Sequence, residues 1–145
     1  AALVLLMSPQ AAERLNVQVQ AAWVAHASVG GAPQTPLLAA ELAAHTALKR
    51  AGLANASNLQ SVELHDAFAV QGLSFAEGLG LSPEQLNPRG GGLARGHPIG
   101  ASAAVALVRL LANLQRDGAP GAQGLVAVAG AGGLGSAALV KRLGA

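Results

Sequence analysis

The stretch Gly90–Ser102, GGGLARGHPIGAS, holds the residue types best suited to chemistry in this chain. It places His97 between a glycine-rich turn and a predicted helix start, where Pro98 fits the first turn because its φ is fixed and it lacks an N–H. Gly96 and Gly100 let the backbone come close to another backbone or to a ligand. An imidazole held in this way can act as a hydrogen-bond donor or a base toward a substrate carbonyl group. The alternative is a structural glycine-rich loop that contains a histidine.

A second pair of polar residues, His65 and Asp66, lies where a short predicted strand is followed by a helix. Residues at the carboxyl ends of parallel strands face the crevice in which α/β proteins bind ligands, so both are candidate site residues. Asp66 also suits the N-cap of the following helix, which is its alternative role.

Two further features could meet an anion. The glycine turn Gly130–Gly135, with Gly132 and Gly133 at its centre, can offer backbone N–H groups to an oxyanion, or it can simply be a tight hairpin. Arg95 can meet a substrate carboxylate or phosphate, or it can be a solvated loop arginine. No metal site is predicted, and no metal-ligand spacing links His26 and His45.

These motifs resemble those of the thiolase family. GHPIGAS is similar to the family's Gly-His-Pro motif, and Asn87 and Gly90-Gly91 resemble the asparagine and glycines ahead of it. The segment Leu125–Val140, LVAVAGAGGLGSAALV, is similar to the family's last two strands and the glycine turn between them. The segment Val62–Gln71, VELHDAFAVQ, is similar to the Asn-Glu-Ala-Phe segment, and closer still to the His-Asp-Cys-Phe version of the sterol-carrier-protein branch. The resemblance covers nearly the whole chain but only the C-terminal half of a family member.

The resemblance implies roles for both histidines. The histidine matching His97 helps to activate a cysteine nucleophile and donates to the thioester oxygen, and His65 stands where the family has an asparagine that holds an oxyanion-hole water. Two positions depart from the family. Ala129 stands in place of the second, proton-shuttling cysteine, and Ala67 in place of the cysteine that the sterol-carrier branch uses instead. A methyl group cannot transfer a proton.

The implied function is acyl transfer to or from a coenzyme A thioester, by Claisen or retro-Claisen chemistry and with no cofactor besides the thioester substrate. The nucleophilic cysteine belongs to the family's N-terminal half, so a partner has to supply it. One alternative is a non-catalytic thiolase-like subunit that stabilises an active homologue or binds acyl-CoA. Another is an altered reaction, such as retro-aldol cleavage of an acyl-CoA.

The resemblance also divides the chain. Residues 1–16 are expected to be the end of the N-terminal half, with the last strand of that half and a link, and residues 17–145 the C-terminal domain. The chain is then a subunit of a split protein or a fragment. Its expected partner is the N-terminal half or a homologous subunit, in a homo- or hetero-oligomer.

Composition agrees with such a domain. Of 145 residues 52% are hydrophobic, but two Phe and one Trp are the only aromatic residues, so the core is expected to consist of Ala, Val and Leu, with Trp23 inside it. Only 11% are charged, against about 25% in typical soluble domains, which suggests that another chain or domain covers part of the surface. The net charge of +2 without a basic cluster argues against nucleic-acid binding. No cleavable signal and no apolar run of about 18 residues is present, so a cytoplasmic protein without a membrane span is expected.

The predicted fold is α/β: a five-stranded mixed sheet in the order βαβαβαββ, mainly parallel, with helices on both faces. The expected strands are the opening AALVLLMS, Val17–Ala27, Ser61–Leu64, Gly124–Ala129 and Gly135–Lys141, the last two as an antiparallel pair. The expected helices are Ser8–Leu15 with Ser8 as N-cap, Leu37–Ala51, Asp66–Leu79 and Ile99–Arg116.

Overall fold

The computed structural model describes residues 1–144 and is built on a mixed four-stranded sheet in the order β1-β4-β3-β2. β2 and β3 run parallel, whereas β4 is antiparallel to both β1 and β3. The strands are β1 (Ala21–Gly30), β2 (Ser61–Leu64), β3 (Gln123–Gly130) and β4 (Leu134–Arg142). The helices are α1 (Pro9–Leu15), the 3-10 turn η1 (Pro36–Leu38), α2 (Ala39–Arg50), α3 (Ala69–Leu79), α4 (Gly92–Arg95) and α5 (Ser102–Asp117).

The predicted strand count and direction were partly wrong. The opening AALVLLMS forms no strand, because no strand of the described residues pairs with it, and β1 begins at Ala21, where β4 ends opposite it at Arg142. The sheet is not mainly parallel, since only β2 and β3 pair in that way. Beyond β2 the chain adds a single parallel bridge, Val62 to Leu86.

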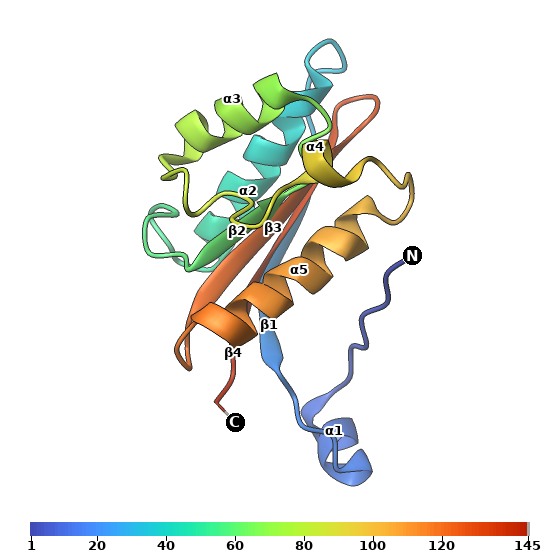
Figure 1. The fold of residues 1–145 in the computed structure, drawn as a ribbon, viewed down its shortest axis with the longest axis vertical. Coiled ribbons are helices and arrows are strands. Elements are labelled where there is room, and N and C mark those ends of the chain that lie inside the picture. The colour runs from blue at the N-terminus through green and yellow to red at the C-terminus, as the bar shows by residue number, and fades with distance from the viewer. Residues whose placement is uncertain (145) are drawn as a thin grey trace.

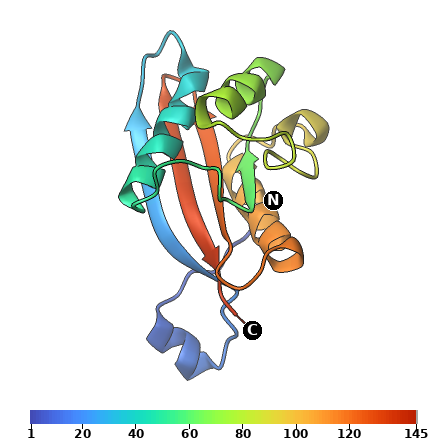
Figure 2. The same cartoon turned by 90° about the vertical axis from the view of Figure 1, so that its left-hand side faces the viewer.

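Helices cover both faces of the sheet, as predicted. Side chains of β3 and β4 alternate between the two faces, since successive residues of a strand point in opposite directions. Leu125 and Leu139 pack in the core beneath α2 and α3, while Val126 and Val140 pack against α5. Figures 1 and 2 show α2 and α3 on one side of the sheet and α5 on the other.

The core consists largely of small residues, as the composition indicates. α2 presents four fully buried alanines to the sheet: Ala40, Ala43, Ala44 and Ala47. On the other face α5 lies so close to β3 that a Cβ at Gly124 would fall 2.6 Å from the Leu110 side chain. Small residues thus set the distance between the layers.

Two helix starts differ from the prediction in ways that shape the site. α3 begins at Ala69, because Phe68 is extended and the Asp66 N–H bonds back to the Leu64 carbonyl. α5 begins at Ser102, because Gly100 adopts φ +85°, in the left-handed region. Ser8 does cap α1, accepting from the Ala11 N–H at 3.2 Å.

Apolar surface is exposed between the N-terminal segment, the start of β1 and α5. A groove of about 740 Å³ lies there, and Leu3 and Leu5 beside it are 86% and 71% exposed. Trp23, expected in the core, lines the same groove and is 45% exposed. Figures 1 and 2 show α1 projecting beyond one end of the sheet. Among the described residues, no helix is long and apolar enough to cross a bilayer.

We expect the isolated chain to associate with itself, because this groove and its leucines leave a large apolar area in contact with water. Size-exclusion chromatography with light scattering measures the effect. A variant with Leu3, Leu5 and Leu6 replaced by Ser serves as the matched control and should associate less. A wild-type chain that stays monomeric at high concentration would contradict the expectation.

Candidate active site

The structure brings His65 and His97 together, although 32 positions separate them (97 − 65) in the chain. Their ring centroids are 4.2 Å apart, with the planes inclined at 33°. His65 directly follows β2 and is buried, and its N–H donates to the Ala127 carbonyl of β3 at 3.1 Å. His97 lies on the exposed loop between α4 and α5. A fixed ring on the sheet thus faces a ring carried by a loop.

Ser102 orients the His97 ring, a function that the sequence analysis missed. The Ser102 hydroxyl donates to the Pro98 carbonyl at 3.2 Å and lies 2.7 Å from His97 Nδ1. A hydroxyl has one hydrogen, so when it donates to Pro98 it accepts from Nδ1–H. In that tautomer the His97 Nε2 carries a lone pair and is free to act as a base.

A glycine backbone packs against His65 and Asp66. The Gly92 N–H donates to Asp66 Oδ1, and a Cβ on Gly92 would fall 2.8 Å from His65 Nδ1. Gly91 is equally confined, because a Cβ there would fall on the Asp66 carboxylate and the Asn87 amide. Asp66 therefore holds the glycine segment rather than capping α3, as the alternative role would have it.

The surroundings of His65 on balance favour its neutral form. Burial lowers its pKa from the ordinary value of 6.5, and the nearby His97 and Arg95 lower it further, against the opposing charge of Asp66. Its Nε2 is buried and has no hydrogen-bond partner among residues 1–144. A buried polar nitrogen without a partner is costly, and such groups are often satisfied by a water or a ligand.

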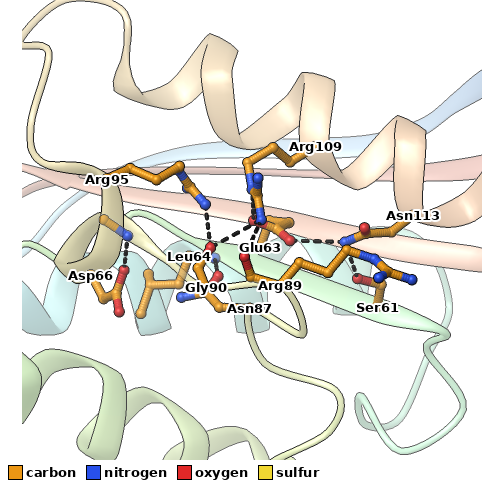
Figure 3. Close-up of polar contacts among 11 residues, drawn as sticks. Ser61, Glu63, Leu64, Asp66, Asn87, Arg89, Gly90, Arg95, Arg109 and Asn113 are labelled. Carbon is orange, nitrogen blue, oxygen red and sulfur yellow. Dashed lines mark hydrogen bonds and ion pairs between the residues drawn. The ribbon is translucent and has the colours of Figure 1, made fainter.

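Between β2 and α5 lies a buried polar network that the sequence analysis also missed (Figure 3). Glu63 of β2 is fully buried; its Oε1 accepts from Asn113 Nδ2 at 2.9 Å, and its Oε2 lies 3.5 Å from Arg109 Nε. Burial raises the pKa of Glu63, and the charges of Arg109 and Arg95 oppose that shift. The sequence did hold a sign of this network: Glu63 stands inside a predicted strand, and Arg109 and Asn113 are four positions apart on one predicted helix.

Arg95 and Gly96 connect α4 to the His97 loop. Arg95 donates from Nη1 to the Gly90 carbonyl, which ties the side chain to its own loop (Figure 3). Burial lowers the pKa of Arg95, as does the charge of Arg109. Gly96 adopts φ +84° and ψ −177°, a conformation that other residues rarely adopt, and it directs the chain from α4 toward His97. Contact of Arg95 with a substrate stays a prediction.

The glycine turn forms the predicted hairpin between β3 and β4. Gly132 and Gly133 have φ of +79° and +82°, and the Gly133 carbonyl accepts from the Gly31 N–H at 2.7 Å. Because β2 and β3 are parallel, the turn after β3 and His65 after β2 lie at the same end of the sheet, where both strands finish. Its service as an oxyanion site stays a prediction.

The two alanines that the family resemblance places at cysteine positions differ in location. Ala67 follows Asp66 directly, and its N–H donates to Gln71 Oε1 at 3.1 Å. Ala129 is partly buried at the end of β3 and packs against the core on the α2 side. No group of three His, Asp or Glu in residues 1–144 could hold a metal ion.

Comparison with known proteins agrees with this fold and these motifs. The family model for the thiolase C-terminal domain matches residues 17–142. An acetyl-CoA acetyltransferase of Chromobacterium violaceum is 40% identical over 98% of the chain, and the peroxisomal 3-ketoacyl-CoA thiolase B of Rattus norvegicus 36% identical over 97%. The crystal structure of Acat5 thiolase from Ascaris suum in complex with coenzyme A superposes with a TM-score of 0.86, at 33% identity over 94% of the chain.

The fold and the motifs therefore define a C-terminal thiolase domain, and the chain belongs to the thiolase family. It spans about a third of these proteins: 36% of the Chromobacterium violaceum enzyme, 33% of the Rattus norvegicus enzyme and 34% of the Ascaris suum chain. The particular resemblance to the sterol-carrier-protein branch stays a prediction.

We predict that His65 makes stability depend on pH. The unfolded chain takes up a proton at His65 below about pH 6.5, whereas the folded protein resists protonation to lower pH. The unfolded state then binds more protons, so the free energy of unfolding falls as the pH falls below 6.5 and through the folded pKa. Urea unfolding of the complete protein between neutral and mildly acidic pH measures this.

In the variant His65→Asn, which cannot be protonated, the pH dependence in this window should flatten. Glu63 has a raised pKa and contributes with the opposite sign from pH 4.5 upward, but it is present in both proteins. His45→Asn removes a half-exposed histidine of α2, 3.8 Å from Glu41, and is the control for the loss of an imidazole elsewhere; it should keep the dependence that His65→Asn loses. Equal pH profiles for wild type and His65→Asn would contradict the prediction.

Proposed function

We propose that this chain supplies the histidine side of a thiolase-type acyltransferase site acting on coenzyme A thioesters. The observation that carries the proposal is the His65–His97 pair, whose ring centroids are 4.2 Å apart. The pair lies at the end of the sheet where β2 and β3 finish and where the glycine turn also lies. The names of the relatives, acetyl-CoA acetyltransferase and 3-ketoacyl-CoA thiolase, support the substrate class.

His97 can serve in two successive steps. Its Nε2 takes the proton of a thiol, and the thiolate then attacks the thioester carbonyl carbon. The resulting imidazolium donates Nε2–H to the developing oxyanion, which stabilises the charge where it forms. When the carbon–sulfur bond breaks, the departing thiolate of coenzyme A recovers the proton. Ser102 keeps Nδ1 occupied throughout, so Nε2 alone faces the reaction.

His65 completes the oxygen-binding side. Its Nε2 is buried and unpartnered, and its lowered pKa keeps the ring neutral. A neutral imidazole can hold a water or the thioester oxygen without adding a second positive charge beside His97. The transfer moves an acyl group between thiols with no change in oxidation state, so we propose that no further cofactor takes part.

The nucleophile has to come from elsewhere, because these residues contain no cysteine. We propose that an N-terminal thiolase half, in the same polypeptide or in a partner, supplies it and covers the groove of about 740 Å³ beside α5. Residues 1–16 would belong to that half and residues 17–145 to the C-terminal domain. A homo- or hetero-oligomer and a cytoplasmic location remain part of this proposal.

One specific observation favours a non-catalytic alternative. Alanine stands at both positions where the family resemblance places the second cysteine, Ala67 and Ala129. Such a subunit would keep the fold in order to stabilise an active homologue or to bind acyl-CoA. The intact His97 loop, with its Ser102 contact, favours catalysis instead.

We expect His97→Ala in the complete protein to lower kcat by about 10²–10³, the usual effect of losing one oxyanion donor. Folding should change little, because His97 lies on an exposed loop. Steady-state thiolysis or condensation assays, with circular dichroism as a check of folding, measure this. His45→Ala is the matched control. An unchanged kcat in an active protein would assign His97 a structural role.

A cysteine at one of the two alanine positions should raise the rate of carbon–carbon bond formation and cleavage, and of no other step. We expect Ala67→Cys, the position next to Asp66, to speed condensation or its thiolytic reverse, since a general acid–base group contributes about 10²–10⁴-fold. Acyl-enzyme formation should stay the same, because it needs only the nucleophile and His97. Ala129→Cys is made separately for comparison. If the wild type already condenses rapidly and neither variant changes the rate, another group moves the proton, and an altered reaction such as retro-aldol cleavage becomes the better hypothesis.

A further inference from the structure

Glu63 is a carboxylate at a position where the sheet would ordinarily bury an apolar side chain. It is 0% exposed and faces α5, where Asn113 donates to one oxygen and Arg109 lies 3.5 Å from the other. An ionised carboxylate in the interior needs a cation and hydrogen bonds beside it to be tolerated. On α5, Arg109 supplies that cation and Asn113 a hydrogen bond.

Arg109 also binds the turn that precedes α4. Its Nη2 donates to the Arg89 carbonyl at 2.7 Å and to the Gly90 carbonyl at 3.1 Å (Figure 3). The Arg89 side chain ties the same turn to Asp117, at 2.9 Å, but both partners of that pair are over 40% exposed, and exposed pairs contribute little. Arg109 is only 25% exposed, so its contact is the better shielded of the two.

The turn held by Arg109 leads straight to the histidines. Gly91 and Gly92 follow Gly90, and the Gly92 backbone packs on His65 and donates to Asp66. α4 then runs from Gly92 to Arg95, and His97 comes two residues later. A shift of the Gly90 carbonyl would therefore move both the backbone that covers one histidine and the segment that carries the other.

We propose that Arg109, anchored by the buried Glu63, is a positioning residue for the site: it fixes the 89–92 turn on which the approach of the two histidine rings depends. Arg109 touches neither ring, so it acts through the turn. Its importance for turnover rests on the proposed function, whereas its effect on the histidine rings does not.

The test uses the complete protein that carries this chain, together with its nucleophile. The double variant Glu63→Gln/Arg109→Met removes the tether without leaving an unpaired buried charge. Arg109→Lys keeps the charge beside Glu63, but it lacks the planar fork whose separate nitrogens lie beside Glu63 (Nε) and at the two carbonyls (Nη2). Arg50→Met is the matched control, since Arg50 likewise donates to a backbone carbonyl, that of His26, but outside the site.

Two readouts separate positioning from a general loss of stability. One readout is whether kcat or KM changes. A small misplacement of catalytic groups can lower the rate by about 10²-fold, so in the double variant kcat should fall by about 10–100-fold with little change in KM. The other is the NMR titration of the His65 and His97 ring protons. The groups facing His65 are His97, Asp66 and Arg95. When the turn no longer shields the ring, water reaches it, and the pKa of His65 should rise toward 6.5.

Arg109→Lys should give a smaller change in the same direction, and Arg50→Met none. A His65 titration identical to wild type in the double variant and in Arg109→Lys would overturn the proposal, even if kcat fell. If the double variant does not fold, the His65 titration in Arg109→Lys tests the proposal by itself. A wild-type protein without acyltransfer activity would refute the proposed function, while the titrations would still decide whether Arg109 positions the histidines.

Discussion

The site depends on one close approach, that of the Gly91–Gly92 backbone to the side chains of His65 and Asp66. A Cβ at Gly92 would fall 2.8 Å from the His65 ring, so the two segments can meet only where a side chain is absent. The Asp66 carboxylate completes the contact by accepting from the Gly92 N–H. α4 and the loop that carries His97 follow directly from this contact along the chain.

This contact lies on a rigid support. The layers of the domain pack through alanine and glycine, with four buried alanines on α2 and Gly124 beneath Leu110 on the other face. Interiors packed at this density resist small displacements. A β-strand that is fixed on both faces can present His65 at its end with little freedom, as the role proposed for His65 requires.

The interior of the domain also contains an ionisable side chain, that of Glu63. Glu63 is fully buried, so removing the cation beside it would leave an ionised carboxylate uncompensated. Glu63 and Arg109 therefore constrain each other, and both constrain the turn whose carbonyls Arg109 binds. The same feature explains why α5, which is predicted from its apolar face alone, also carries polar residues toward the sheet.

Much of this arrangement was determined by local sequence. The Ser8 cap and the hairpin around Gly130–Gly135 follow from capping and glycine content, which act over a few residues. The short strand Ser61–Leu64 also lies where it was predicted. The two candidate histidines were found in the same way, from short motifs.

Other features needed the tertiary structure, because they depend on contacts between distant segments. The opening AALVLLMS has the apolar character of a strand but pairs with none in residues 1–144, and strand formation requires a partner. Asp66 has the character of a cap, yet its carboxylate binds Gly92, 26 residues away. Asn113 and Arg109 belong to no motif, and Ser102 ends the GHPIGAS stretch without a role that the sequence reveals. Only folding placed them against His97 and Glu63, where a hydrogen bond or a counter-ion was needed.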